Sequence, residues 1–179
     1  MLKTLSLIAS LSLASAAMAE DFTLASNDIT GPNLEMAQFA NSFGCTGGNV
    51  SPELHWSGAP AGTQSFVITL YDPDAATGSG WWHWTVANIP ATVTSLPTGA
   101  GNAPDKMPDG AMMTNTDMGQ PGFLGACPPP GEPHHYRFTI KALNVPKLDL
   151  TPNATAAMLG AMSNGTKIGE AHLDVIGKR

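Results

Sequence analysis

Residues 65–84 read Ser65-Phe66-Val67-Ile68-Thr69-Leu70-Tyr71-Asp72-Pro73-Asp74-Ala75-Ala76-Thr77-Gly78-Ser79-Gly80-Trp81-Trp82-His83-Trp84. The first seven are mostly β-branched and aromatic, which predicts a buried strand. A loop rich in Pro and Gly follows, and a second strand is expected from Trp82 to Ile89, where Pro90 stops it. Asp72 has the parity of the apolar residues before it, so it ends an otherwise apolar face. A carboxylate that ends one strand can meet an imidazole that begins the next, and we expect Asp72 and His83 to form one wall of an anion-binding pocket.

The rest of the chain reads as short strands with turns between them. Short strands are expected at residues 22–24, 53–56 and 171–176. Residues 134–143 alternate and predict a strand with one buried face, and residues 34–39 are compatible with a strand or the edge of a helix. Thr151-Pro152 is expected to start a helix that continues to Met162 and ends at Asn164-Gly165. Residues 91–120 lack periodicity and indicate a functional loop or a missed strand. The pattern favours a mainly β fold, a β-sandwich with a late helix.

The first residues have the pattern of a secretory signal peptide. Lys3 precedes an apolar run that is too short to span a bilayer, and Ala17-Met18-Ala19 resembles a cleavage site. We therefore expect a signal peptide at residues 1–19, one ligand-binding domain at residues 20–179, no transmembrane anchor after cleavage, and a periplasmic or secreted location.

The balance of charge excludes two classes of partner. The formal net charge of the chain is −6, and loss of Lys3 makes it −7. Nucleic acids and anionic membrane surfaces need clustered Lys and Arg, and the chain has no basic run. Any anion must therefore be held by a local site.

Two cysteines, Cys45 and Cys127, allow only one intramolecular pairing. In an exported protein oxidation is the default state, so we predict a disulfide between them. It would tie an early loop to the Pro-rich segment Cys127–Tyr136, which we expect to supply the other wall of the pocket.

Four side chains at the loop ends of strands form the candidate site. We expect His83 and His134 to contact the anion, Tyr136 to donate its hydroxyl, and Asp72 to orient a histidine. An anion the size of phosphate needs donors from several directions, which two imidazoles and a phenol supply.

Each of these residues also has a purely structural interpretation. Asp72 and especially Asp74 are residues that form turns, and His83 is compatible with a satisfied histidine in the core. His134 and His135 are compatible with an exposed strand start, and the tryptophans with packing, although Trp81 or Trp82 could flank the pocket. Only the combination of residues favours a site.

Other chemistries find little support in the sequence. The sequence lacks G-x-S-x-G, H-E-x-x-H, a P-loop and a dinucleotide fingerprint. A metal site of Asp72, His83 and His134 is chemically possible but not favoured. Three prolines and a disulfide argue against a nucleophilic Cys127. We expect no metal, no cofactor and no enzymatic activity.

Several segments resemble the phosphatidylethanolamine-binding protein family, and in particular its bacterial branch similar to the Raf kinase inhibitor. The resemblance rests on residues 49–56, Asp72-Pro73-Asp74-Ala75, Trp82-His83-Trp84 with Asn88-Ile89-Pro90, residues 122–131 with His134 and Tyr136, and residues 157–179. It implies two antiparallel sheets and a small pocket for the phosphate of a phospholipid head group or a similar anion. By position, the resemblance implies that the pocket residues are Asp72, His83, Pro129, His134 and Tyr136.

This chain departs from the family pattern at three positions. Ala76 replaces a usual proline, Ala126 stands where a glycine-proline pair is common, and His135 replaces a usual arginine. The first two bear on loop rigidity, and the third lies on the outward face.

These observations predict an exported, non-enzymatic protein that binds a small anion or phospholipid head group. The resemblance also suggests a first alternative, an inhibitor or interaction module that acts on a protease or a kinase. The second alternative is a hydrolase that uses the Asp and His cluster.

Overall fold

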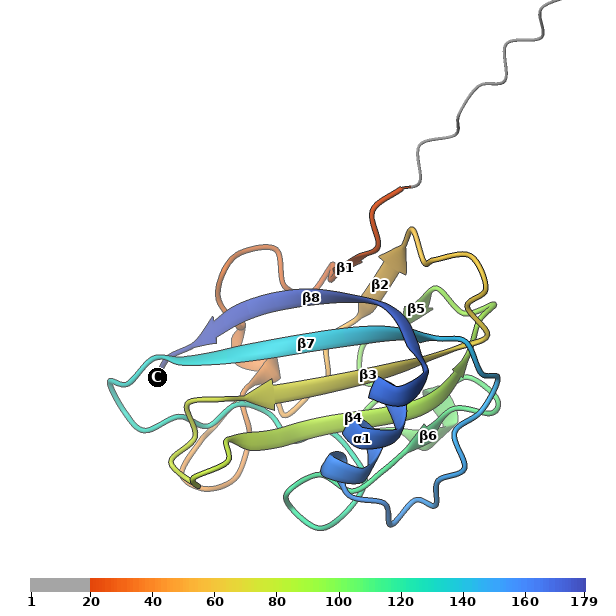
Figure 1. Cartoon of the computed structure of the whole chain (residues 1–179). Coiled ribbons are helices and arrows are strands. Elements are labelled where there is room, and N and C mark those ends of the chain that lie inside the picture. The colour runs from red at the N-terminus through yellow and green to blue at the C-terminus, as the bar shows by residue number, and fades with distance from the viewer. Residues whose placement is uncertain (1–19) are drawn as a thin grey trace, which may run out of the picture.

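The structure, a computed structural model, describes residues 20–179, and the predicted signal peptide at residues 1–19 lies outside them. Two antiparallel sheets face one another, with one helix on the outside (Figure 1). The smaller sheet has the order β1-β2-β5 and the larger sheet the order β6-β4-β3-β7-β8. The strands are β1 (Thr23–Ala25), β2 (Leu54–Ser57), β3 (Ser65–Asp72), β4 (Trp81–Pro90), β5 (Ser95–Leu96), β6 (Met112–Met113), β7 (His134–Leu143) and β8 (Lys167–Gly177). The predicted mainly β fold with two antiparallel sheets is therefore confirmed.

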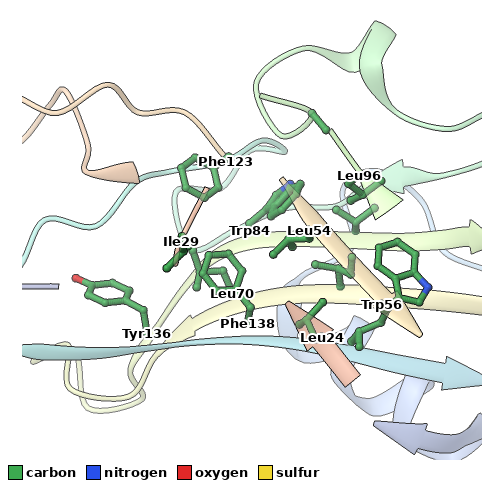
Figure 2. Packing of buried hydrophobic residues seen from close by; sticks show 14 of the residues in the cluster. Leu24, Ile29, Leu54, Trp56, Leu70, Trp84, Leu96, Phe123, Tyr136 and Phe138 are labelled. Atoms are coloured by element: carbon green, nitrogen blue, oxygen red, sulfur yellow. The ribbon is translucent and has the colours of Figure 1, made fainter. Parts of the chain in front are cut away.

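The main core lies between the two sheets. Alternate residues of β3, namely Phe66, Ile68 and Leu70, point into it and pack against Leu54 and Trp56 of β2. Figure 2 shows the residues of both sheets that meet in this layer. The expected parity of β3 holds, because Val67 instead contributes to a second, smaller cluster.

The second cluster joins the outer face of the larger sheet to the helix α1 (Ala156–Thr166). Leu159 of α1 is buried there with Val67, Ala87 and Leu143. This helix also shows where the sequence interpretation was wrong. Thr151-Pro152 forms a turn, and Thr155 caps the helix by accepting the backbone N–H of Met158.

The bounds of the last helix and the last strand also differ from those predicted. Helix α1 runs through Asn164-Gly165 to Thr166, and β8 is longer than the predicted strand at residues 171–176. Residues 34–39 contain a short 3-10 helix, η1 (Met36–Gln38). Residues 91–120 contain the strands β5 and β6 and a second 3-10 helix, η2 (Pro104–Lys106). The stretch without periodicity therefore contained two short strands.

Two irregularities in the pairing of β3 with β4 alter the direction of side chains. Leu70 pairs with Trp84 but Tyr71 pairs with Trp82, so His83 is an extra residue in β4. A second shift near Asn88 coincides with a left-handed backbone, with a φ of 59°. Such β-bulges bend a strand and redirect side chains. Within residues 20–179, no helix is long and apolar enough to cross a membrane.

Candidate functional site

Asp72 lies at the end of β3, where the strand runs into the loop at residues 73–80. It is 2% exposed. Its Oδ1 accepts the backbone N–H groups of Asp74 at 2.8 Å and Ala75 at 3.1 Å, and these bonds fix the start of the loop. Its Oδ2 lies 2.8 Å from Nδ1 of His134 and 4.0 Å from Nε2 of His83. The carboxylate is therefore shared between the loop backbone and two imidazoles.

The bulge in β4 brings His83 to this carboxylate. In an unbroken strand His83 would face away from Trp84, but the extra residue lets both side chains turn inward. Nδ1 of His83 lies 3.0 Å from the carbonyl oxygen of Leu124, to which an Nδ1–H donates, and the His83 carbonyl accepts the N–H of Leu124. These contacts assign the tautomer of the neutral ring and leave its Nε2 on the side of Asp72. Burial lowers the pKa of His83, while the Leu124 carbonyl and the charge of Asp72 oppose this effect.

Tyr136 in β7 supplies a buried hydroxyl. Its ring is 1% exposed and lies 5.3 Å from the ring of His83, centroid to centroid. No described group meets hydrogen-bond geometry with its oxygen, although Asp72 and the backbone of Cys127 lie near enough to affect the pKa of the phenol. Figure 2 shows this oxygen pointing away from the core cluster to which the ring belongs. Burial, and secondarily the negative charge of Asp72, hold the pKa of Tyr136 far above its usual value, so the phenol is a neutral donor.

These side chains surround one cavity with a volume of about 290 Å³. All five residues expected in the pocket line it: Asp72, His83, Pro129, His134 and Tyr136. Further lining residues are Phe43, Asp74, Ala75, Ala76, Trp81, Leu124, Gly125, Cys127 and Glu132. This described lining contains three carboxylates and no Lys or Arg, so only the imidazoles could give it positive charge.

Two loops that form the cavity are fastened to each other. Cys45 and Cys127 form the predicted disulfide, across 82 positions of sequence. Arg179 donates from Nε to the carbonyl of Pro128 at 2.6 Å and from Nη1 to that of Gly44 at 2.8 Å. The first loop is thus held beside the Pro-rich segment by a covalent bond and by a guanidinium group, whose role the sequence did not indicate.

Gly125 lines the cavity and lies close to the backbone of residues 38–40. The amide oxygen of Asn49 accepts its N–H at 2.8 Å. A Cβ at this position would lie 2.5 Å from the backbone nitrogen of Ala40 and equally close to the carbonyl oxygen of Gln38. Only glycine allows the chain to pass here.

Asp74 has a different role from the turn-forming one that we favoured. The turn contacts come from Asp72, whereas Asp74 Oδ2 lies 2.7 Å from both the backbone nitrogen and Nδ1 of His135. These contacts lower the pKa of Asp74, and the backbone N–H contributes most. His135 points outward, as expected, and the pair joins the loop after β3 to the start of β7.

Some residues of the cavity were not anticipated from the sequence. Phe43 and Leu124 carry no pattern that marks them, although Phe43 is an aromatic residue within a Gly-rich segment. Glu132 lies in the Pro-rich segment that we expected to form a wall, but it was not singled out. Trp81 lines the cavity, whereas Trp82 packs on Tyr71 with ring centroids 4.4 Å apart. Within residues 20–179, no group of three or more His, Cys, Asp or Glu side chains is arranged to hold a metal ion.

Comparison with known proteins places this chain in a family. Residues 26–177 match the family model of phosphatidylethanolamine-binding proteins. YbcL of Escherichia coli is 52% identical over 161 residues, which cover 88% of each chain. YbhB of the same organism is 50% identical over 138 residues, or 76% of this chain and 87% of YbhB. The crystal structure of YbcL superimposes with a TM-score of 0.86 at 50% identity, over 89% of this chain and 99% of that chain. The chain belongs to the phosphatidylethanolamine-binding protein family, in the bacterial branch that includes these relatives.

Proposed function

We propose that this protein is exported and binds a phosphate or a similar anion, such as a phospholipid head group, without chemical turnover. The anion lies in the cavity and accepts hydrogen bonds from His83, His134 and Tyr136. Asp72 orients the histidines, its charge favours the protonated form of His83, and Pro129 closes the opposite wall. The disulfide supports export, because structural disulfides persist in oxidising compartments.

One observation carries the proposal: a buried tyrosine hydroxyl that has no hydrogen bond of good geometry within residues 20–179 lines the same cavity as two imidazoles that share one carboxylate. A buried donor without an acceptor is costly, and an anion oxygen would satisfy it. The Nδ1 contact of His134 with Asp72 leaves Nε2 free to donate to a ligand when the ring is protonated. Because the described lining has no Lys or Arg, protonated imidazoles must supply the positive charge.

Calorimetric titration with inorganic phosphate and with phosphoethanolamine tests the site. We expect saturable binding by the wild type, lost in the double variant His83→Gln, His134→Gln. The control His172→Gln changes a histidine on β8 outside the cavity and should bind as the wild type does. Equal heats in the double variant and the wild type would contradict the proposal.

The absence of turnover is tested separately. Incubation with p-nitrophenyl phosphate should release no nitrophenol above the level of the double variant. Release that depends on both histidines would favour a hydrolase, and release that a chelator stops would favour a metal-dependent one. Detection of the protein in the periplasmic or culture-medium fraction of an expressing bacterium tests export.

A further inference from the structure

Phe43 separates the anion cavity from a second hollow. It lines both, as does Leu124, so the two hollows adjoin at these side chains. The second hollow has a volume of about 230 Å³. We call it the Phe43 groove. Its lining residues are Ser42, Phe43, Asn49, Thr116, Met118, Gln120, Pro121, Gly122, Phe123 and Leu124.

The ring of Phe43 is 65% exposed, the largest exposure among the bulky apolar residues described. Its backbone is left-handed, with a φ of 56°, a conformation that bulky residues rarely adopt. Unfavourable backbone conformations of this kind are concentrated at ligand sites. The position brings a strained backbone and an exposed ring to the mouth of a pocket, and neither of these stabilises the free protein.

Neighbouring contacts fix the segment that carries Phe43. The N–H of Cys45 donates to the carbonyl of Ser42 at 2.9 Å, and Cys45 is held by the disulfide. Arg179 binds the carbonyl of Gly44. The ring is thus supported on a fastened loop, which limits the entropy that it would lose on meeting a ligand.

Charge is distributed unevenly around the cavity. Asp74 and Glu132 line the cavity but not the Phe43 groove, and none of the groove residues is charged. The exposed side chains of Phe43 and Met118 are both apolar and both line the groove. An uncharged substituent on a bound phosphate would therefore bind more favourably in the Phe43 groove than beside the carboxylates of Asp74 and Glu132.

We propose that the Phe43 groove is a subsite for the apolar group of a phosphate ester whose phosphate occupies the anion cavity. Phe43 contacts the first carbons of that group, and Met118 contacts carbons farther from the phosphate. This inference rests on the proposed function, and it narrows the ligand from an anion to an organophosphate with an alkyl or aryl substituent.

Titration of inorganic phosphate, n-butyl phosphate and n-octyl phosphate into the wild type tests the subsite. Each CH₂ group removed from water favours binding by about fourfold, so even partial burial should make butyl phosphate bind about tenfold more tightly than phosphate. Octyl phosphate should bind more tightly again. The alkyl phosphates are used at concentrations below those at which they form micelles.

Two variants test which side chains cause the gain in affinity of the alkyl phosphates. Phe43→Gly removes the ring and tolerates the left-handed backbone, so butyl phosphate should lose its gain in affinity over inorganic phosphate, whatever change the variant makes to phosphate affinity itself. Met118→Ser should retain the gain of butyl phosphate and reduce the further gain of octyl phosphate. The control Met36→Ala removes a side chain that is 60% exposed and lines neither hollow, and it should change none of these affinities.

The outcomes separate this inference from the proposed function. Equal affinities for phosphate and both esters in the wild type, or gains that Phe43→Gly leaves intact, overturn the subsite while the anion site stands. Failure of phosphate and of both esters to bind overturns the anion site, and the subsite with it.

Cosedimentation with vesicles of phosphatidylcholine that contain phosphatidic acid distinguishes two sources of the ester. Binding that Phe43→Gly weakens would identify a membrane lipid, and binding of butyl phosphate without cosedimentation would identify a soluble ester. Both results support the subsite, whereas cosedimentation that Phe43→Gly does not change, together with equal ester affinities, counts against it.

Discussion

Nδ1 of His134 lies 2.8 Å from Oδ2 of Asp72, although the two residues are 62 positions apart in the chain. The contact forms because β7 pairs directly with β3 in the larger sheet. Neither side chain is appreciably exposed, so the pair lies in a medium where electrostatic interactions are stronger than in water. The candidate site is therefore also part of what stabilises this end of the sheet.

Asp72→Ala should reduce the free energy of unfolding by about 2 to 4 kcal/mol, because it leaves His134 and two backbone N–H groups without their acceptor. Urea unfolding measures the change. Asp174→Ala is the matched control, since its exposed ion pair with Arg137 should contribute about 1 kcal/mol or less. Similar losses in the two variants would contradict the structural role of Asp72.

The stability of the free protein should fall as the pH drops below about 6.5, the ordinary pKa of histidine. The folded protein has a lowered pKa for His83, so below that pH the unfolded chain binds the proton more readily. The stability contribution of neutral His83 is fully present above this range and is lost as the pH falls toward the folded pKa. Urea unfolding at several pH values should show a smaller decline for His83→Gln than for the wild type.

Anion affinity should change with pH in the opposite sense to this stability. A bound anion favours the protonated imidazoles, so sulfate, which stays fully ionised over the range, should bind more weakly as the pH rises from about 5 to about 8. Calorimetry in buffers with different ionisation enthalpies should also detect proton uptake on binding. A flat profile would show that neutral donors alone hold the anion.

Removal of the disulfide should destabilise the protein and loosen the pocket. In the chain-entropy model a cross-link across 82 positions contributes about 4.5 kcal/mol. The double variant Cys45→Ser, Cys127→Ser should unfold at lower urea concentration and bind phosphate less tightly, because Cys127 lines the cavity and Cys45 fastens the Phe43 segment. Unchanged phosphate affinity in the folded variant would show that Arg179 alone suffices to position the loops.

Two glycine substitutions should have opposite effects on the stability of the protein. Gly125→Ala places a methyl group against the backbone of Ala40 and should destabilise the protein by about 2 kcal/mol or more. Gly160→Ala lies in α1, where a Cβ would meet nothing within 4 Å, and should stabilise it by up to about 1 kcal/mol. Thermal unfolding of both variants checks the pair. Tolerance of Gly125→Ala would mean that the cavity lining at Gly125 can shift away from the backbone of Ala40.

The sequence predicted those parts of the fold in which local pattern and tertiary contacts agree. Strand β7 has the bounds that its alternation predicts, and β3 differs only by including Asp72. The start of α1 was missed because Thr151 and Thr155 both offer a capping hydroxyl, and only the contacts of the folded chain select Thr155. The first half of β8, with Gly169 and exposed polar residues, is a strand because β7 pairs with it.

For the site, the residue types and the parity of Asp72 could be read from the sequence, but the direction of His83 could not. Position along strands pointed to Asp72, His134 and Tyr136, and family resemblance added Pro129. The bulge that turns His83 inward depends on how β3 and β4 pair, which no local pattern records. Phe43 was missed because exposure and a left-handed backbone are properties of the folded loop.

The position of β8 as an outer strand affects how copies of this protein meet one another. An outer strand of 11 residues offers unpaired backbone groups to which another chain could add. Its last part is capped, because Ile176 exchanges backbone hydrogen bonds with Pro32 and Leu34, and Glu170, His172 and Asp174 place ionisable groups along the remainder. Replacing these three with threonine would remove that protection, and aggregation would then be expected to start along this margin of the sheet (Figure 1).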